Sequence, residues 1–227
     1  MNYQVVRSDR KTICLKITPD GEVVVRAPRR CSEAYIRGFV EDHIAWILRN
    51  QAIVRSRNAG RDQFCLSQGD HISLCGSDYE IRIVPGLSAA VLRDQIILPS
   101  VDRSRTRKAV LSLAKKHGMP FLRSRLDFWT SRMGISYQDV KISTARNRWG
   151  SCSRDGVIRI SVFLLFAPSR AIDYVLVHEL AHRRQFDHSS AFWRIVSAAM
   201  PDWKEQRAVL KRFQSEPLVQ FLAEKDA

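Results

Sequence analysis

Three histidines and one glutamate lie close together in the C-terminal part of this 227-residue sequence. The run His178-Glu179-Leu180-Ala181-His182 is followed six residues later by His188. Successive residues of an α-helix turn by about 100°, so His178 and His182 would lie one turn apart on the same face, where two imidazoles can chelate a metal ion. The composition predicts only roughly 0.005 chance occurrences of a His-Glu-x-x-His pattern, which favours a functional site.

The four side chains are expected to have different roles. Glu179 projects beside the histidine pair, poorly aimed to bind the metal but well placed to deprotonate water. A catalytic zinc ion takes three protein ligands and keeps a fourth position open, and His188 is the expected third ligand. We therefore predict an open zinc site, with another divalent metal as the alternative, formed by the ligands His178, His182 and His188 and the base Glu179.

The composition is that of a globular protein, with 45% hydrophobic and 26% charged residues. No apolar run approaches the roughly 18 residues that a membrane span needs, and the first residues do not resemble a signal peptide, so we expect a cytoplasmic protein without membrane contact. The net charge of +14 favours acidic partners or nucleic acid. The densest basic cluster, at residues 103–125, fits the solvent side of an amphipathic helix, and a nucleic-acid-binding stripe is the alternative.

The elements that must position the site predict an α+β protein. Residues 1–99 form a β-rich N-terminal region, with a hairpin turning at Asp20-Gly21, one helix beginning at Ser32 and several short strands up to Leu98. Nothing in this region has the spacing of a catalytic site. We place the boundary after Pro99.

Residues 100–227 are expected to form the catalytic domain. The predicted elements are a helical stretch at 104–132 interrupted near Gly118-Met119-Pro120, strands at 140–143 and 156–166, and an active helix from Pro168-Ser169 to Phe186. His188 would then lie beyond the end of the active helix, on a turn that folds back toward the metal.

Four separated motifs carry a family resemblance. They are Arg148-Trp149-Gly150-Ser151-Cys152, the run from Ile172 to His182, His188-Ser189 with Phe192-Trp193, and Met200-Pro201-Asp202-Trp203. In this order they resemble the YgjP-like metal-dependent hydrolases, a group related to the WLM and SprT-like metallopeptidases. The resemblance covers most of the chain. It implies a minimal zincin-like α+β domain, in which the active helix packs on a small mixed or antiparallel sheet, and the same zinc ligands and base.

The spacing between His182 and His188 is also that of the metzincins, which place a glycine three residues after the second histidine. Here that position is Gln185. We therefore expect a bend that does not depend on glycine, near Phe186-Asp187.

Two reactions fit the predicted site. A zinc metallopeptidase is favoured, in which the exposed edge of a strand at 158–163 would bind an extended peptide. A metal-dependent nucleoside triphosphate pyrophosphatase is the alternative, in which Arg146 and Arg148 would hold phosphate oxygens. A peptidase predicts apolar subsites and an unpaired strand edge, whereas a nucleotide hydrolase predicts a compact basic pocket.

Three further residues are candidates for substrate binding. Arg146 and Arg148 precede the strand expected to approach the active helix, and Tyr174 lies one turn before His178. A structural role in ion pairing or packing stays open for each. A basic DNA-associated protein with a structural metal is the weakest interpretation, because structural zinc sites are usually closed by four ligands rich in cysteine. SprT-like relatives act on proteins attached to DNA, so nucleic acid also stays open as a scaffold for a peptidase.

Overall fold

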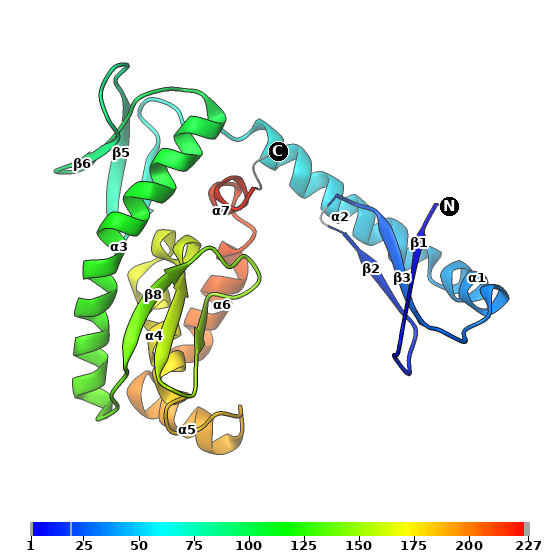
Figure 1. The fold of residues 1–227 in the computed structure, drawn as a ribbon. Coiled ribbons are helices and arrows are strands. Elements are labelled where there is room, and N and C mark those ends of the chain that lie inside the picture. The colour runs from blue at the N-terminus through cyan, green and yellow to red at the C-terminus, as the bar shows by residue number, and fades with distance from the viewer. Residues whose placement is uncertain (1, 19, 225–227) are drawn as a thin grey trace. The chain divides into compact units, whose positions relative to one another are not determined.

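Residues 64–99 pack with the C-terminal part of the chain. The computed structural model describes residues 2–18 and 20–224, with their side chains except at 57–63, and forms two units, Met1–Gln63 and Phe64–Ala227 (Figure 1). This division differs from the boundary expected after residue 99. The reason is packing, since apolar side chains such as Ile72 and Ile96 are buried in the core of the second unit.

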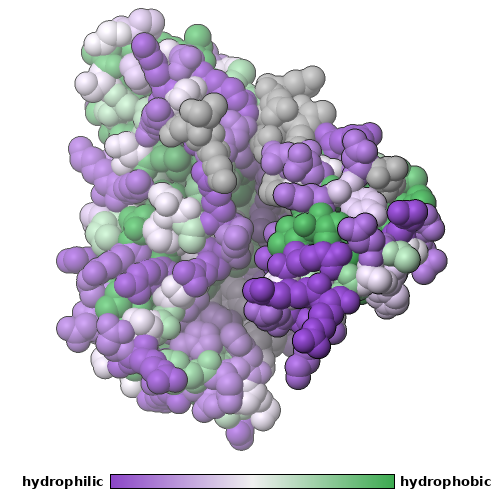
Figure 2. Space-filling model, turned by 45° about the vertical axis from the view of Figure 1, so that its right-hand side comes forward, coloured by the Kyte–Doolittle hydropathy of each residue, from purple (hydrophilic) through white to green (hydrophobic). Residues whose placement is uncertain are grey.

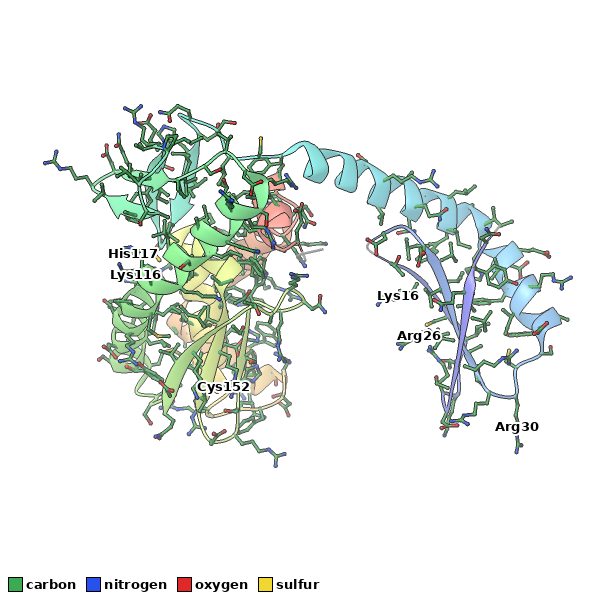
Figure 3. The ribbon with its side chains drawn as sticks, turned by 45° about the horizontal axis from the view of Figure 1, so that its top comes forward. Lys16, Arg26, Arg30, Lys116, His117 and Cys152 are labelled. Atoms are coloured by element: carbon green, nitrogen blue, oxygen red, sulfur yellow. The ribbon has the colours of Figure 1, made fainter. Side chains whose placement is uncertain are left out.

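The first unit contains a three-stranded sheet in the order β1-β3-β2. The strands are β1 (Gln4–Ser8), β2 (Cys14–Ile17) and β3 (Val23–Pro28). β2 and β3 are antiparallel, as the predicted hairpin requires, and Gly21 adopts the positive φ of +85° in the turn. Lys16 and Arg26 lie on the same face of this sheet (Figure 3).

The opposite face of the sheet is covered by helices. Val25 and Ala27 are fully buried there together with Ile36 and Ile47. The helices are α1 (Glu33–Asp42) and α2 (Ile44–Gln63). The sequence predicted a single helix from Ser32 onward, but two form because the first ends at His43.

The second unit begins with a four-stranded sheet in the order β4-β5-β7-β6. Its strands are β4 (His71–Leu74), β5 (Ser77–Ile83), β6 (Ala90–Leu92) and β7 (Gln95–Leu98). β5 and β7 run parallel, while the other two pairs are antiparallel. The sequence patterns predict short strands around 72–74, 79–84 and 95–98, which correspond to β4, β5 and β7, but they do not predict the short β6.

A long helix, α3 (Arg103–Met133), follows this sheet without a break. The predicted interruption near Gly118-Met119-Pro120 is therefore wrong. A Cβ at position 118 would lie 2.3 Å from Cδ1 of Leu165, so glycine is present here for close packing. Pro120 is accommodated within the helix.

The candidate site is formed by a second, mixed sheet and a group of helices. The elements are β8 (Asp139–Ser143), β9 (Gly150–Cys152), β10 (Val157–Ser161), the 3-10 helix η1 (Val162–Phe166), α4 (Ser169–Ala181), α5 (Ser190–Ala199), α6 (Trp203–Phe213) and α7 (Pro217–Leu222). α4 contacts α3, α5, α6 and β9 (Figure 1). This arrangement confirms the predicted α+β class, with the active helix packed on a small mixed sheet.

Two predicted element boundaries in this region are wrong. The strand expected at 156–166 ends at Ser161, and the chain continues as η1. β10 lies between β8 and β9, so the segment 158–163 does not offer the exposed edge that the peptidase hypothesis assigned to it. The short β9, which the sequence analysis missed, occupies an edge of this sheet.

The basic cluster at residues 103–125 is divided between solvent and interior. Lys116 is exposed on α3, as expected for the solvent side of an amphipathic helix (Figure 3). Arg107 is buried and donates a hydrogen bond to the main-chain oxygen of Glu224 at 2.5 Å, and Arg103 forms an ion pair with the Glu224 carboxylate. Part of the cluster therefore holds the C-terminal segment.

Hydrophilic side chains cover most of the face shown in Figure 2. No helix within the described part of the chain combines the length and the apolar character needed to cross a bilayer.

A buried ion pair joins α4 to α3. The Nε and Nη2 atoms of Arg125 donate to the two carboxylate oxygens of Asp173 at 2.8 and 2.5 Å. The Asp173 side chain is 4% exposed, and Arg125 satisfies both of its carboxylate oxygens.

We predict that Arg125→Met lowers the free energy of unfolding by about 2–3 kcal/mol, because it leaves the Asp173 carboxylate buried without a counter-charge. Urea denaturation would measure the change. The double variant with Asp173→Asn should recover part of the loss, and Arg123→Met, an exposed site on the same helix, should change stability by less than about 0.5 kcal/mol. Equal effects at positions 123 and 125 would contradict the assignment.

Candidate active site

The three histidines predicted as metal ligands converge at the C-terminal end of α4. Their ring centroids are 5.0 Å apart for His178 and His182, 5.0 Å for His178 and His188, and 4.9 Å for His182 and His188. The buried ring of Phe192 lies between 4.7 and 4.8 Å from each imidazole. Among the side chains that the structure describes, which exclude those of residues 57–63, this histidine triad is the one group of three or more His, Cys, Asp or Glu that could hold a metal ion.

A tight turn brings His188 back to the helix. α4 ends at Ala181, not at Phe186 as predicted, and the backbone N–H groups of residues 183 to 185 bond back to carbonyls of Leu180 and Ala181. The Asp187 carboxylate then accepts hydrogen bonds from the Gln185 side chain at 2.8 Å and from the backbone N–H of Ser189 at 3.1 Å. No residue from 182 to 188 has a positive φ, so the turn needs no glycine.

The donor set of the triad fits a zinc ion. Zinc binds imidazole nitrogens at about 2.1 Å, which places tetrahedral ligand atoms roughly 3.4 Å apart. The Nε2 atoms of His178 and His188 are 3.1 Å apart. Nδ1 of His182 lies 3.2 Å from the carbonyl oxygen of Gln185, which leaves the Nε2 of that ring for a metal.

The protonation state of His178 also suits a ligand. Burial, assisted by the positive charges of His182, His188 and Arg207, lowers the pKa of His178 to about 3 from the ordinary 6.5. The ring is therefore neutral at physiological pH, as metal binding requires.

Glu179 lies in the tight contact between α4 and β9. A Cβ on Gly150 would be 2.6 Å from Oε1 of Glu179 and 2.9 Å from Cγ1 of Val175, so glycine is required for this close approach. Burial raises the pKa of Glu179 to about 8 from 4.5, and the positive charge of Arg148 opposes the rise. A carboxylate that gains and loses a proton near neutral pH meets the requirement for a general base.

The three residues predicted to bind substrate have different surroundings. Tyr174 is buried, with its ring 5.9 Å from that of His178. Arg148 is exposed and close enough to act electrostatically on Glu179. Arg146 instead donates to the main-chain oxygen of Glu224 at 2.7 Å. The geometry thus brings Tyr174 and Arg148 to the site and gives Arg146 a structural contact.

A cavity of about 410 Å³ adjoins the triad. It is bounded by Trp149 and Gly150 on one side, by α4, and by one face of α6, whose lining residues are Arg207, Leu210, Lys211 and Gln214. The sequence analysis missed this α6 face. The spacing of three and four residues indicates a common helix face, but only the packing of α6 beside α4 gives that face a function.

Comparisons with known proteins identify a metallopeptidase family. The family described as YgjP-like, metallopeptidase domain, matches residues 11–213. Among solved structures, the crystal structure of the metallopeptidase zymogen of Pyrococcus abyssi abylysin is 26% identical, covering 40% of this chain and 89% of that chain with a TM-score of 0.36. No curated protein matches.

We predict that His188→Ala lowers zinc affinity by at least roughly 100-fold, because it removes one of three ligands. Competition titration with a chromogenic chelator would measure the affinity. His71→Ala serves as the control, since His71 is exposed and paired with Asp78 away from the triad. Unchanged affinity in the His188 variant would remove this residue from the metal site.

A second prediction concerns the metal-free protein. Between pH 4.5 and about 8 the folded state keeps a proton on Glu179 that the unfolded state loses, so this group contributes stability at low pH that disappears as pH rises. Glu179→Gln removes the titration. The melting temperature of the variant relative to the parent should therefore be higher at about pH 8.5 than at about pH 5. A difference independent of pH, measured calorimetrically in chelator, would contradict the raised pKa.

Proposed function

The chain belongs to the YgjP-like metallopeptidase family, and from this premise we propose that it is a zinc-dependent peptidase in which Glu179 is the general base. The observation that carries the proposal is the convergence of three imidazoles with one buried carboxylate beside them. Burying a carboxylate costs free energy, so a helix packed only for stability would gain nothing from this residue.

A zinc ion held by His178, His182 and His188 would supply Lewis acidity for the attack of water on a carbonyl carbon, and its charge would favour the ionised form of Glu179. Glu179 accepts the proton of the attacking water and returns it to the leaving amine. Arg148 favours the carboxylate form of this base. Because Gly150 has no side chain, the backbone of β9 can lie close to the Glu179 carboxylate.

An extended peptide is the substrate that this surface suits. β9 is an edge strand of its sheet, and Trp149 and Gly150 at its start also line the cavity. A peptide added alongside β9 would place its backbone beside the triad and its side chains toward the cavity. The edge assigned from the sequence to 158–163 is thus replaced by the edge of β9.

The nucleotide alternative requires a compact pocket formed mainly by cations. The cavity contains Arg207 and Lys211, but aromatic and aliphatic side chains from Trp149, Val175 and Leu210 form much of its wall. This mixed lining and the neighbouring strand edge favour a peptide over a triphosphate.

We predict that Glu179→Gln lowers peptide hydrolysis by at least roughly 100-fold while the bound zinc content is unchanged, because the variant loses the base but keeps the ligands. Zinc-loaded protein would be offered casein-derived peptides and nucleoside triphosphates in parallel. Metal content would be measured by mass spectrometry.

The matched control is Glu41→Gln, an exposed carboxylate in the first unit, which should retain parental turnover. Chelation should abolish turnover and added zinc restore it. Parental activity in the Glu179 variant would refute the assignment of the base, and hydrolysis of triphosphates without peptide cleavage would refute the peptidase.

A further inference from the structure

Among the described residues, two cations and one acidic residue line the cavity. Arg207 and Lys211 are one turn apart on α6 and both are exposed. Glu179 is the one acidic residue among the lining residues, and it is the proposed base. The cavity therefore presents excess positive charge to a bound substrate.

The position of Arg207 connects this charge to the metal ligands. Its guanidinium carbon is 5.9 Å from the ring centroid of Trp193, and that ring is in turn 5.9 Å from the centroids of both His178 and His188. Trp193 stacks on Trp203 at 4.2 Å, which fixes the indole between α5 and the beginning of α6. The Arg207 guanidinium and the rings of His178 and His188 thus lie around the same anchored indole.

The other residues that line the cavity indicate which kind of side chain could bind beside the two cations. The side chains of Trp149, Val175 and Leu210 provide an apolar wall, while Tyr174 and Gln214 offer polar groups. An apolar wall with two convergent cations fits a side chain that has a short aliphatic stem and a negatively charged end. Glutamate and aspartate have this form.

We propose that this cavity is a specificity subsite, in which Arg207 and Lys211 bind the carboxylate of an acidic residue adjacent to the peptide bond that is cleaved. The proposal rests on the peptidase function and adds its substrate class, acidic peptides. A residue held there would be positioned by α6, while the backbone of the same peptide lies along β9. Arg207 and Lys211 act on substrate selection and take no part in proton transfer.

The test compares peptides that differ only in having a carboxylate or a carboxamide at one side chain. Pairs of fluorogenic peptides with Glu or the isosteric Gln on either side of the cleaved bond would be hydrolysed by the zinc-loaded full chain, and mass spectrometry would locate the bond. We expect kcat/KM to favour Glu roughly tenfold or more at one position, because a charge-assisted contact is lost with Gln. High salt should reduce this ratio.

Variants assign the preference to the two cations. In the double variant Arg207→Gln with Lys211→Gln, the ratio of kcat/KM for the Glu peptide to that for the Gln peptide should fall to about one. The single variant Lys211→Glu should instead prefer a peptide with Lys at the same position. Arg212→Gln is the matched control, since Arg212 is exposed on the same helix but does not line the cavity. It should keep the parental ratio.

A binding measurement separates this proposal from the peptidase itself. Fluorescence anisotropy would compare the same Glu and Gln peptides on the zinc-loaded Glu179→Gln variant, with and without the α6 substitutions. Tighter binding of the Glu peptide that depends on residues 207 and 211 supports the subsite even if the parent cleaves no peptide. Cleavage or binding with equal preference for Glu and Gln overturns the subsite and leaves the peptidase standing. A free C-terminal carboxylate as the bound group would appear as a loss of binding on peptide amidation, and that outcome also overturns the side-chain assignment.

Discussion

The burial of α4 is the constraint on which the rest of the second unit depends. Ten of its 13 residues are buried, because α3, α5, α6 and β9 pack around it. Such a helix has no broad solvent face, and its C-terminal half reaches solvent mainly through the cavity beside α6. The candidate metal ligands lie at the C-terminal end, where His178 and His182 are partly exposed. Packing on several sides also limits the movement of these imidazoles, which favours a preorganised metal site.

The turn after α4 is held by contacts with distant parts of the unit. Arg183 donates to the carbonyl of Arg154 at 2.7 Å, and Arg184 donates to the carbonyl of Gly134 at 2.9 Å. These bonds attach the segment leading to His188 to the sheet and to the end of α3. Positive charge thus has a structural use here, as it does in the pairing of Arg125 with Asp173. Several basic residues therefore serve the fold, so the net charge by itself is no argument for nucleic acid.

The close approach of β9 to α4 determines the surroundings of Glu179. Gly150 permits the contact with Glu179, and the burial that results raises the pKa of that carboxyl. The same approach places the edge of β9 beside the triad and the cavity. One short strand therefore shapes the surroundings of Glu179 and, in the proposed function, would offer a backbone edge to a peptide.

Local sequence patterns determined the helix that carries the site. The periodicity around His178 and Glu179 predicted α4 and the identity of the candidate ligands, and the alternation of apolar residues predicted most strands, because these signals depend on neighbours in the chain. The beginning of α4 at Ser169 agrees with the prediction, while its end does not. No local signal distinguishes a helix that continues to Phe186 from one that ends at Ala181 and turns.

Only the tertiary structure decided which distant segments meet. β6 and β9 were missed because three-residue strands have almost no periodic signal and form by pairing with neighbours. Arg207 and Lys211 were missed because their spacing marks a helix face but not the element it faces. The sequence by itself therefore determined the chemistry of the candidate site, since its ligands lie on one helix and the turn after it. Long-range packing decided the cavity, the strand edge and the place of residues 64–99, because burial depends on contacts between residues far apart in the chain.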